Sequence, residues 1–338
     1  MAMTLAEMKV GMSDKVAQKV VDIFLRESEV LQLLPFDNCI SPSEGSTLTY
    51  SYIQKLLPSV AAFRTLNNEY TANQATVQKK SADLKIFGGS FQMDRVLKAA
   101  EGKYNNMAFQ MQEKILAAIS LFHYTLINGD ATTHTEQFDG LDKMLAGTAT
   151  EYGAPAAIDI STAANLKTNA DQMYEALQLL IKNTKADALL MNSAMIAKVQ
   201  TLARILGYRT ETEEAFGRKV TSMDGVRFMD LGNNYTTTTS GGTTVAVANA
   251  VVPAGISRTF GTGNDATTVT GLTDVYAVKF SVEDGFHGVS LTGSNAVRAY
   301  VPDFSQPGAV KTGEVEMVAA TVLKNTQHAG VLRNVKIA

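Results

Sequence analysis

The residues best suited to acid–base or metal chemistry are four histidines and one cysteine, which stand far apart in the sequence. The histidines are His123, His134, His287 and His328, and the cysteine is Cys39. None has the close spacing of zinc ligands, so the sequence predicts no metal site. A lone histidine also needs partners for acid–base work. We expect His123 to pack within its helix, His287 to lie in a turn and Cys39 to be a buried or idle thiol.

Motifs for nucleotide binding and hydrolysis are also missing. The sequence contains no P-loop, no G-x-S-x-G elbow and no H-E-x-x-H pair. Gly261 and Gly263 lack the third glycine of a dinucleotide-binding turn, and the glutamates between 211 and 214 are typical of a solvated face. Asn234 begins a glycosylation sequon, which a protein made in the cytoplasm would not use. We therefore predict no catalytic, cofactor-binding or metal-binding residues and no enzymatic activity.

The composition is that of a globular chain with a large core. Of 338 residues, 45% are hydrophobic and 19% are charged, which is enough apolar material for two ordinary domains or one elaborated domain. The net charge of −3 argues against a dedicated DNA-binding surface. The single cysteine fits a reducing compartment, and neither a secretory signal nor a membrane-spanning run is present. We expect a soluble protein made in the cytoplasm.

The longest predicted element is a helical rod from residue 94 to residue 128. Apolar side chains recur there at steps of three and four, which is the period of one buried helical face. Asp94 is suited to cap its start, and Asn128 with Gly129 to end it. At about 1.5 Å per residue the rod would be roughly 50 Å long. Gly102 alone interrupts it, at a cost of about 1 kcal/mol relative to alanine.

Before the rod we expect an arm and a flap. Residues 13–34 have the apolar periodicity of an amphipathic helix, which Pro35 stops. Residues 47–53 alternate as a half-buried strand does, and residues 76–91 form a second extended stretch. Together they predict a long two-stranded flap, which would be marginal in water without cover. The pattern leaves two sources of that cover open, namely a neighbouring molecule and the rest of the same chain.

After the rod, helices and strands alternate, which predicts a mixed α/β domain. We expect a short helix over 138–145, a linker over 147–167, a helix over 169–182, a strand over 186–191, a helix capped by Asn192 or Ser193 and ended at Gly207, and strands over 226–231, 275–280, 288–291 and 296–301. Residues 232–273 are rich in Gly, Thr, Asn and Ala and predict a loop-rich insertion or surface hairpins. The last strand, which includes 314–323, has the length to pair beside the rod.

This order of elements resembles the major capsid protein of tailed bacteriophages, whose fold is known as the Hong Kong 97 type. The stretches that carry the resemblance are the rod at 94–128, the NGD and QFDGL turn at 128–141, LLMNSAMIAKVQTLARILG at 189–207, SMDGVRFMDL at 222–231, TDVYAVKF at 273–280 and the closing LRNVKIA at 332–338. They span most of the chain, and the likeness is one of architecture rather than of a single motif.

The resemblance implies an α+β Hong Kong 97-type capsid fold. Its parts would be an N-terminal arm at 1–44, an extended E-loop hairpin at 45–92, a P-domain with the spine helix at 93–165, an A-domain at 166–300 with a variable insertion at 232–273, and a C-terminal P-domain strand at 301–338. It also implies a structural head protein that assembles as hexamers and pentamers into an icosahedral shell around double-stranded DNA, in virions assembled in the host bacterial cytoplasm.

The implied partners are further copies of the chain, scaffold, portal and decoration proteins, and DNA held by non-specific contacts that weaken with salt. No membrane and no cofactor are implied. The chain reaches the arm almost at once, so we expect a separate scaffold protein or none. Some members of the family join lysine to asparagine across subunits. Lys79, Lys80 and Lys85 are candidates by location, but no motif supports such a bond, and a solvated charge or an intersubunit ion pair is favoured.

Three other interpretations stand beside this one. An encapsulin-type nanocompartment shares the fold and encloses enzymes, but the long flap, the insertion and the chain length favour the phage capsid. A soluble enzyme is disfavoured because the constellations above are missing. A tail or decoration protein should lack a rod between the flap and the α/β domain.

Overall fold

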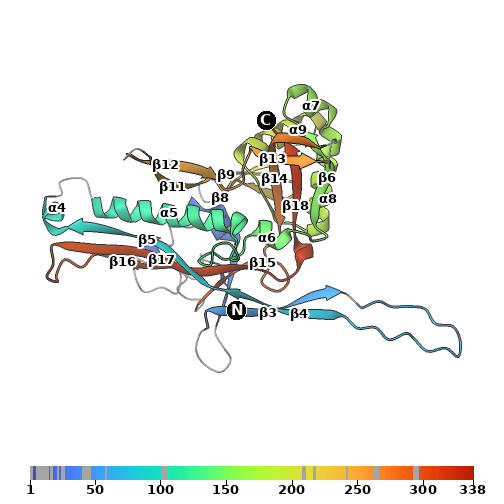
Figure 1. Ribbon diagram of the computed structural model, residues 1–338, viewed down its shortest axis with the longest axis horizontal. Helices are drawn as coiled ribbons and strands as arrows, with labels where there is room; N and C mark the ends of the chain where they lie inside the picture. The colour runs from blue at the N-terminus through green and yellow to red at the C-terminus, as the bar shows by residue number, and fades with distance from the viewer. Residues whose placement is uncertain are drawn as a thin grey trace.

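The computed structural model describes residues 3–4, 15, 18–20, 23, 27–39, 47–57, 59–100, 106–207, 211–215, 218–240, 243–261, 266–291 and 297–338. These residues form two large β-sheets, a long helix that crosses one of them, and two projecting hairpins (Figure 1). The molecule is elongated, because one hairpin extends far beyond the two packed bodies.

The first sheet has six strands and is built around β17 (Val310–Leu323). Along one edge β17 pairs antiparallel with β5 (Lys85–Asp94). Along the other edge it pairs with β16 (Val297–Tyr300) and then with β15 (Phe286–Ser290). β2 (Pro35–Asn38) runs parallel to β15, and β1 (Met3–Thr4) closes the sheet. A chain segment from the far C-terminal part therefore holds together strands from four other places in the sequence.

Helix α5 (Asn106–Asn128) lies on this sheet, against β5 and β17 (Figure 1). Its fully buried Phe122 stacks on Phe87 of β5 with 5.8 Å between ring centroids and meets Phe138 at 5.9 Å. The prediction that the last long strand lies beside the rod is confirmed. The predicted end of the rod at Asn128 is confirmed as well.

The predicted rod is not one continuous helix from residue 94. Asp94 does cap a helix, because its side chain accepts a hydrogen bond from the Val96 N–H, but α4 (Arg95–Ala99) ends after five residues. Val96 and Leu97 are about two-thirds exposed, so this turn buries no apolar face that would stabilise a longer helix. Gly102, the one interruption expected in the rod, lies outside the described residues.

The predicted helix over 13–34 is also divided, and most of 13–26 lies outside the described residues. Ser28 has an extended backbone, and its Oγ accepts a hydrogen bond from the Leu31 N–H at 3.1 Å. It is the N-cap of a separate helix, α3 (Glu29–Leu33), since a capping residue stands outside helical geometry. Pro35 ends α3 as predicted and then begins a strand of the first sheet.

The predicted flap is present as an antiparallel hairpin of β3 (Thr49–Leu57) and β4 (Thr76–Asp83). The second extended stretch does not continue unbroken to residue 91 as predicted. Leu84 is buried between β4 and β5, and there the chain leaves the hairpin and enters the first sheet. The flap is thus continuous with the strand that pairs with β17.

The second sheet has eight strands, in the order β6, β18, β14, β7, β10, β9 and β8, with β13 beside β14. Their bounds are β6 (Glu151–Asp159), β7 (Ala188–Leu190), β8 (Glu211–Ala215), β9 (Arg218–Met223), β10 (Val226–Met229), β13 (Ile256–Phe260), β14 (Thr267–Val278) and β18 (Ala329–Lys336). Three helices accompany it: α7 (Ala163–Thr168), α8 (Ala170–Thr184) and α9 (Ser193–Leu206).

The centre of the second sheet is buried on both faces. Ala188 and Leu190 point into the core shared with α5 and the short helix α6 (Leu141–Leu145), whereas Leu189 points into the core beneath α8 and α9. Successive side chains of a strand face opposite ways, so both faces need apolar residues. This explains why residues 188–191 of the predicted strand are an unbroken apolar run. The predicted helix caps at Asn192 and Gly207 are confirmed.

Several predicted boundaries do not follow the sheets. The linker over 147–167 is wrong, because β6 and α7 lie there and β6 pairs parallel with β18. The segment 301–338 supplies two strands rather than one, and β18 belongs to the second sheet. Conversely, β15 and β16 fall within 166–300 but belong to the first sheet. The chain crosses between the sheets without a change in composition, so no sequence signal marks these boundaries.

The predicted insertion over 232–273 includes a free-standing hairpin, β11 (Asn233–Ser240) with β12 (Thr243–Ala250). Its base is attached to α5, because the Asn128 side chain donates to the Val251 carbonyl at 2.7 Å. The hairpin extends over α5 in Figure 1. Surface hairpins, one of the two predicted forms, are what the structure contains here.

The NGD and QFDGL turn depends on two glycines whose backbones touch. The Gly140 N–H donates to the Gly129 carbonyl at 2.8 Å. A Cβ on Gly140 would lie 2.4 Å from the Ile127 carbonyl oxygen, and one on Gly129 would lie 2.2 Å from the Phe138 carbonyl oxygen. Backbone atoms cannot move aside as flexible side chains can, so only glycine fits at either position.

We therefore expect Gly140→Ala to lower the free energy of unfolding by about 1–3 kcal/mol or more, because the added methyl group must displace backbone at the end of α5. Gly255→Ala is the matched control, since a Cβ there meets nothing within 4 Å. Urea unfolding of the two variants beside wild type measures the difference. Equal midpoints for both variants would contradict this account of the turn.

Candidate assembly interface

The flap is the part of the molecule least supported by its own chain. β3 and β4 pair in register from Thr49 opposite Asp83 to Leu57 opposite Thr76. Residues 59–81 are all exposed, and the hairpin projects away from both sheets (Figure 1). The described part of the same chain therefore does not cover the flap. Among the two sources of cover left open by the sequence, the described residues thus favour a neighbouring molecule.

Large apolar side chains on the flap are exposed to solvent. More than half of each is exposed at Ile53, Val60, Phe63, Leu66, Tyr70 and Val77, and Phe63 is fully exposed. Burying one such side chain is worth about 1.5–3 kcal/mol. Clustered exposed apolar residues of this kind mark a surface that binds another molecule.

The flap tip has defined internal contacts. The Asn73 side chain accepts a hydrogen bond from the Val60 N–H at 2.8 Å and donates to the Val60 carbonyl at 2.7 Å. Arg64 lies over the Tyr70 ring, 5.5 Å from its centroid. The Asn73 amide thus pairs with both the N–H and the carbonyl of Val60, as the backbone of a neighbouring strand would. These contacts lie within the tip, which nothing else in the described chain covers.

At its root the flap is attached to the first sheet. The Tyr50 hydroxyl donates to Asp37 Oδ2 at 2.7 Å, and its ring meets His287 edge-on with 6.0 Å between centroids. Lys324 Nζ lies 5.5 Å from the same ring. Burial, together with the hydrogen bond to Asp37, raises the pKa of the Tyr50 phenol. β2 and β15 therefore fix the direction in which the flap leaves the body.

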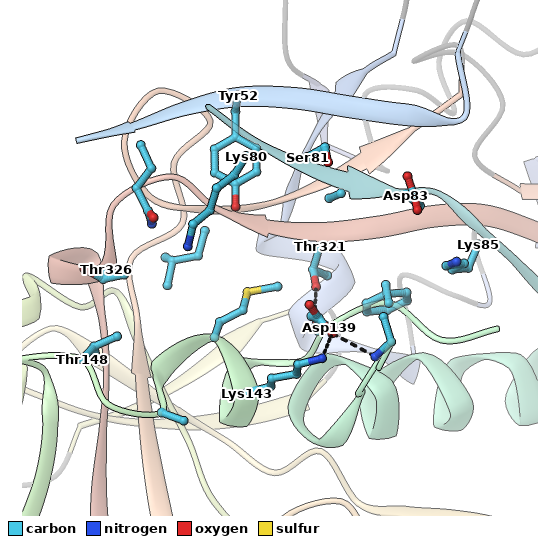
Figure 2. Close-up of a pocket in the computed structure, with 17 residues that line it drawn as sticks. Tyr52, Lys80, Ser81, Asp83, Lys85, Asp139, Lys143, Thr148, Thr321 and Thr326 are labelled. Atoms are coloured by element: carbon cyan, nitrogen blue, oxygen red, sulfur yellow. Dashed lines mark hydrogen bonds and ion pairs between the residues drawn. The ribbon is translucent and has the colours of Figure 1, made fainter. Parts of the chain in front are cut away.

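A cleft of about 430 Å³ lies between the flap root and the turn over 130–148. Figure 2 shows the Lys80 side chain of β4 directed into this cleft. On the opposite wall, Lys143 bridges Asp139 at 2.8 Å and Asp130 at 2.5 Å. The hydrogen bond from Lys143 is the main reason that the pKa of Asp130 is lowered. Lys85 at the mouth of the cleft donates to the Thr135 carbonyl.

A second group of exposed apolar side chains lies at the other end of the molecule. It consists of Val96, Leu97, Tyr300, Val301 and Val310, on and beside α4, β16 and the start of β17. Figure 1 places these elements at the end of the first sheet opposite the flap. The molecule therefore presents apolar surface at both ends of its long axis.

The histidines are not brought together. His123 is buried on α5, where Nε2 lies 2.7 Å from Ser28 Oγ and Nδ1 lies 3.1 Å from the Leu231 carbonyl. It joins three segments and packs as predicted. His287 is not in a turn as predicted but is fully buried in β15. His134 is exposed, and His328 contacts the Asp284 carbonyl through Nδ1 at 2.8 Å.

The other residues considered for chemistry are also scattered. Burial raises the pKa of the Cys39 thiol to about 11, as expected for a buried, idle cysteine. Asn234 is buried at the base of the β11–β12 hairpin. The backbone of 211–214 forms strand β8, and its side chains lie outside the described part, as does Gly263. Lys79 and Lys80 are exposed on β4.

A partly buried ionic network joins the second sheet to α6 and was not predicted. Arg333 Nη1 donates to Asp142 Oδ1 at 2.7 Å and to Asp274 Oδ2 at 3.1 Å, and its Nε donates to Glu151. Arg258 binds the same Asp274 at 2.5 Å. The pairs lie between 16 and 191 residues apart in the sequence. Pairs at such separations leave no local pattern by which to predict them.

In the described part of the chain, no three His, Cys, Asp or Glu side chains come together as metal ligands would. Among the helices that the structure describes, none has the length and apolar character needed to cross a membrane.

No protein-family model matches the chain, and no curated protein matches it in sequence. Solved structures match almost its whole length. A chain of the holo-SrpI encapsulin complex from Synechococcus elongatus is 13% identical with a TM-score of 0.55, over 98% of this chain and 95% of that one. A chain of Mycobacterium phage Bobi is 12% identical with a TM-score of 0.54, over 90% of each chain. A chain from the capsid of a native GTA particle is 12% identical with a TM-score of 0.52, over 96% and 92%.

These likenesses show the fold. The protein has the α+β Hong Kong 97-type capsid fold that the order of its elements predicts.

The environment of His287 predicts that stability depends on pH. Burial, with a smaller contribution from Lys324, lowers the pKa of His287 to about 4, whereas an unfolded histidine titrates near 6.5. Between about pH 4 and pH 6.5, His287 is protonated in the unfolded chain but neutral in the folded chain. Stability is therefore lost as the pH falls from about 6.5 to 4, by up to about 3 kcal/mol.

Urea unfolding of wild type and His287→Gln across this pH range measures the effect. The variant should lose less stability on acidification, because glutamine does not titrate. His134→Gln, at an exposed position, should follow the wild-type curve. Parallel curves for wild type and His287→Gln would refute the assignment.

Proposed function

We propose that this protein is a structural major capsid protein, which assembles as hexamers and pentamers into an icosahedral shell around a double-stranded DNA genome. The observation that carries the proposal is the uncovered flap on a Hong Kong 97-type fold. A two-stranded ribbon with exposed apolar side chains gains stability when another subunit covers it.

In this proposal the parts of the chain have separate tasks. The flap is the E-loop that reaches a neighbouring subunit, the first sheet with α5 is the P-domain and spine, and much of the second sheet with α7, α8 and α9 is the A-domain. The β11–β12 hairpin is the variable insertion. Apolar groups at both ends of one subunit suit a head-to-tail contact, which closes into a ring when the rotation allows it.

The proposed partners are copies of the same chain, with scaffold, portal and decoration proteins during assembly. The protein would be found in the virion head, assembled in the bacterial cytoplasm. Contact with packaged DNA would be electrostatic and independent of base sequence. The proposed role is structural rather than enzymatic.

The second candidate is an encapsulin-type shell that encloses cargo enzymes. It is favoured by one observation, the match to an encapsulin chain over 98% of this chain. The fold serves both kinds of shell, so the contents of the particle separate the two functions.

Negative-stain microscopy of the protein expressed with its neighbouring genes should show closed shells or their hexamers and pentamers. Nuclease-protected DNA inside the shells supports the phage capsid, and co-purifying enzyme supports the nanocompartment. A small monodisperse oligomer under every condition would refute both candidates.

A flap-shortened variant tests which part assembles the shell. Replacing residues 59–75 by Asn-Gly should leave the unfolding free energy within about 0.5 kcal/mol of wild type, because the described chain packs nothing against them. The same variant should form no shells. Shells of wild-type yield from this variant would show that the flap is dispensable.

A further inference from the structure

The outward face of the β5–β17 pair carries a shallow groove of about 210 Å³. Along β5, Phe87 and Phe91 turn toward α5, so the alternate residues Ile86, Gly88 and Ser90 face away from it. Ile86 is about two-thirds exposed. The groove is therefore an uncovered strip of the first sheet, bordered by one apolar side chain.

At Gly88 the floor of the groove has no side chain. A Cβ on Gly88 would lie 2.0 Å from the Val315 carbonyl oxygen on the opposite strand, so no side chain can stand there. Glu314 and Glu316 line the groove on the β17 side. Neither carboxylate makes an ion pair with a described residue. Arg298 stands opposite Glu316 in the β16–β17 register, but the two form no ion pair.

The flap has an outer face of complementary character. Ile53 lies opposite Lys79 in the β3–β4 register, and Val77 lies two residues from Lys79 on the same face. Ile53 and Val77 are well exposed, and Lys79 has no ion pair in the described part of the chain. Lys80 faces the other way, into the cleft beneath the flap (Figure 2). The outer face thus presents two apolar side chains beside one unpaired cation.

The two surfaces cannot meet within one molecule. The chain turns at Leu84, after which β5 and the groove extend toward α4 while the flap extends the opposite way (Figure 1). Only a flap from a second copy can lie on the groove.

We propose that the groove receives the outer face of the flap of a second copy, with Lys79 between Glu314 and Glu316 and with Ile53 and Val77 against Ile86. This inference rests on the proposed function and specifies the contact that selects the neighbouring subunit. Because flap and groove are different surfaces, the contact is head-to-tail and repeats around a ring. Attraction between opposite charges sets the register of the flap in the groove, and repulsion between like charges disfavours other registers.

Charge exchange tests the contact. Lys79→Glu should lower the assembled fraction by at least about tenfold in sedimentation and negative-stain microscopy, and the double variant Glu314→Lys/Glu316→Lys should do the same. The triple variant that combines all three changes should restore assembly to within a few-fold of wild type. All variants are expressed with the neighbouring genes and checked for folding by circular dichroism.

Matched controls carry the same charge changes elsewhere. Lys182→Glu and the pair Asp171→Lys/Glu175→Lys alter exposed positions of α8 and should leave assembly unchanged. If wild type forms shells and the exchanged variants form them equally well, or if the triple variant stays unassembled, the contact is wrong while the proposed function stands. If wild type forms no shells, the proposed function itself fails.

Discussion

The antiparallel pairing of β5 with β17 is the interaction on which the rest of the structure depends. It joins residues 85–94 to residues 310–319 and gives α5 the surface on which it packs. The flap strand β4 ends at Asp83, with Leu84 alone between it and β5. The strands that anchor the flap root lie on the other edge of β17. Gly88 allows the two backbones to approach closely at this point. A long-range strand pair thus sets both the spine and the direction of the flap.

The two sheets share a core instead of forming separate bodies. Leu190 and Tyr276 of the second sheet pack in the same cluster as Phe122 of α5, and Arg333 holds Asp142 of α6 from the second sheet. Asp274, which Arg333 shares with Arg258, is almost fully buried, so loss of its arginine partners would leave a desolvated carboxylate. Movement of one sheet relative to the other would therefore disturb apolar packing and this network together.

The sequence was a good guide wherever structure follows from local chemistry. Caps at Asp94 and Asn192, the stop at Gly207 and the alternation of β3 were all readable, because each depends on residues a few positions apart. The order of elements was enough to predict the fold. The apolar residues of the flap could be located, but the absence of cover was decided only by the tertiary structure.

What could not be predicted depends on distant partners. β6 lies in a small, polar stretch and is a strand because β18 pairs with it. The first helical turn after Asp94 stops at Ala99 because Leu97 has no surface to bury against, and a periodic pattern alone does not supply one. The two glycines of the 128–141 turn could be recognised as part of a motif. The requirement for glycine at both positions comes from contact between backbones that only the folded chain brings together.

The two hydrogen bonds between Asn73 and Val60 at the flap tip affect the entropy of association. Because Asn73 already holds both backbone groups of Val60, the tip loses little conformational freedom when a neighbour covers it. Ordering a flexible segment at an interface consumes part of the binding energy, and here that ordering is completed during folding of the single chain. In the proposed shell, more of the free energy from apolar burial would then be left for holding subunits together.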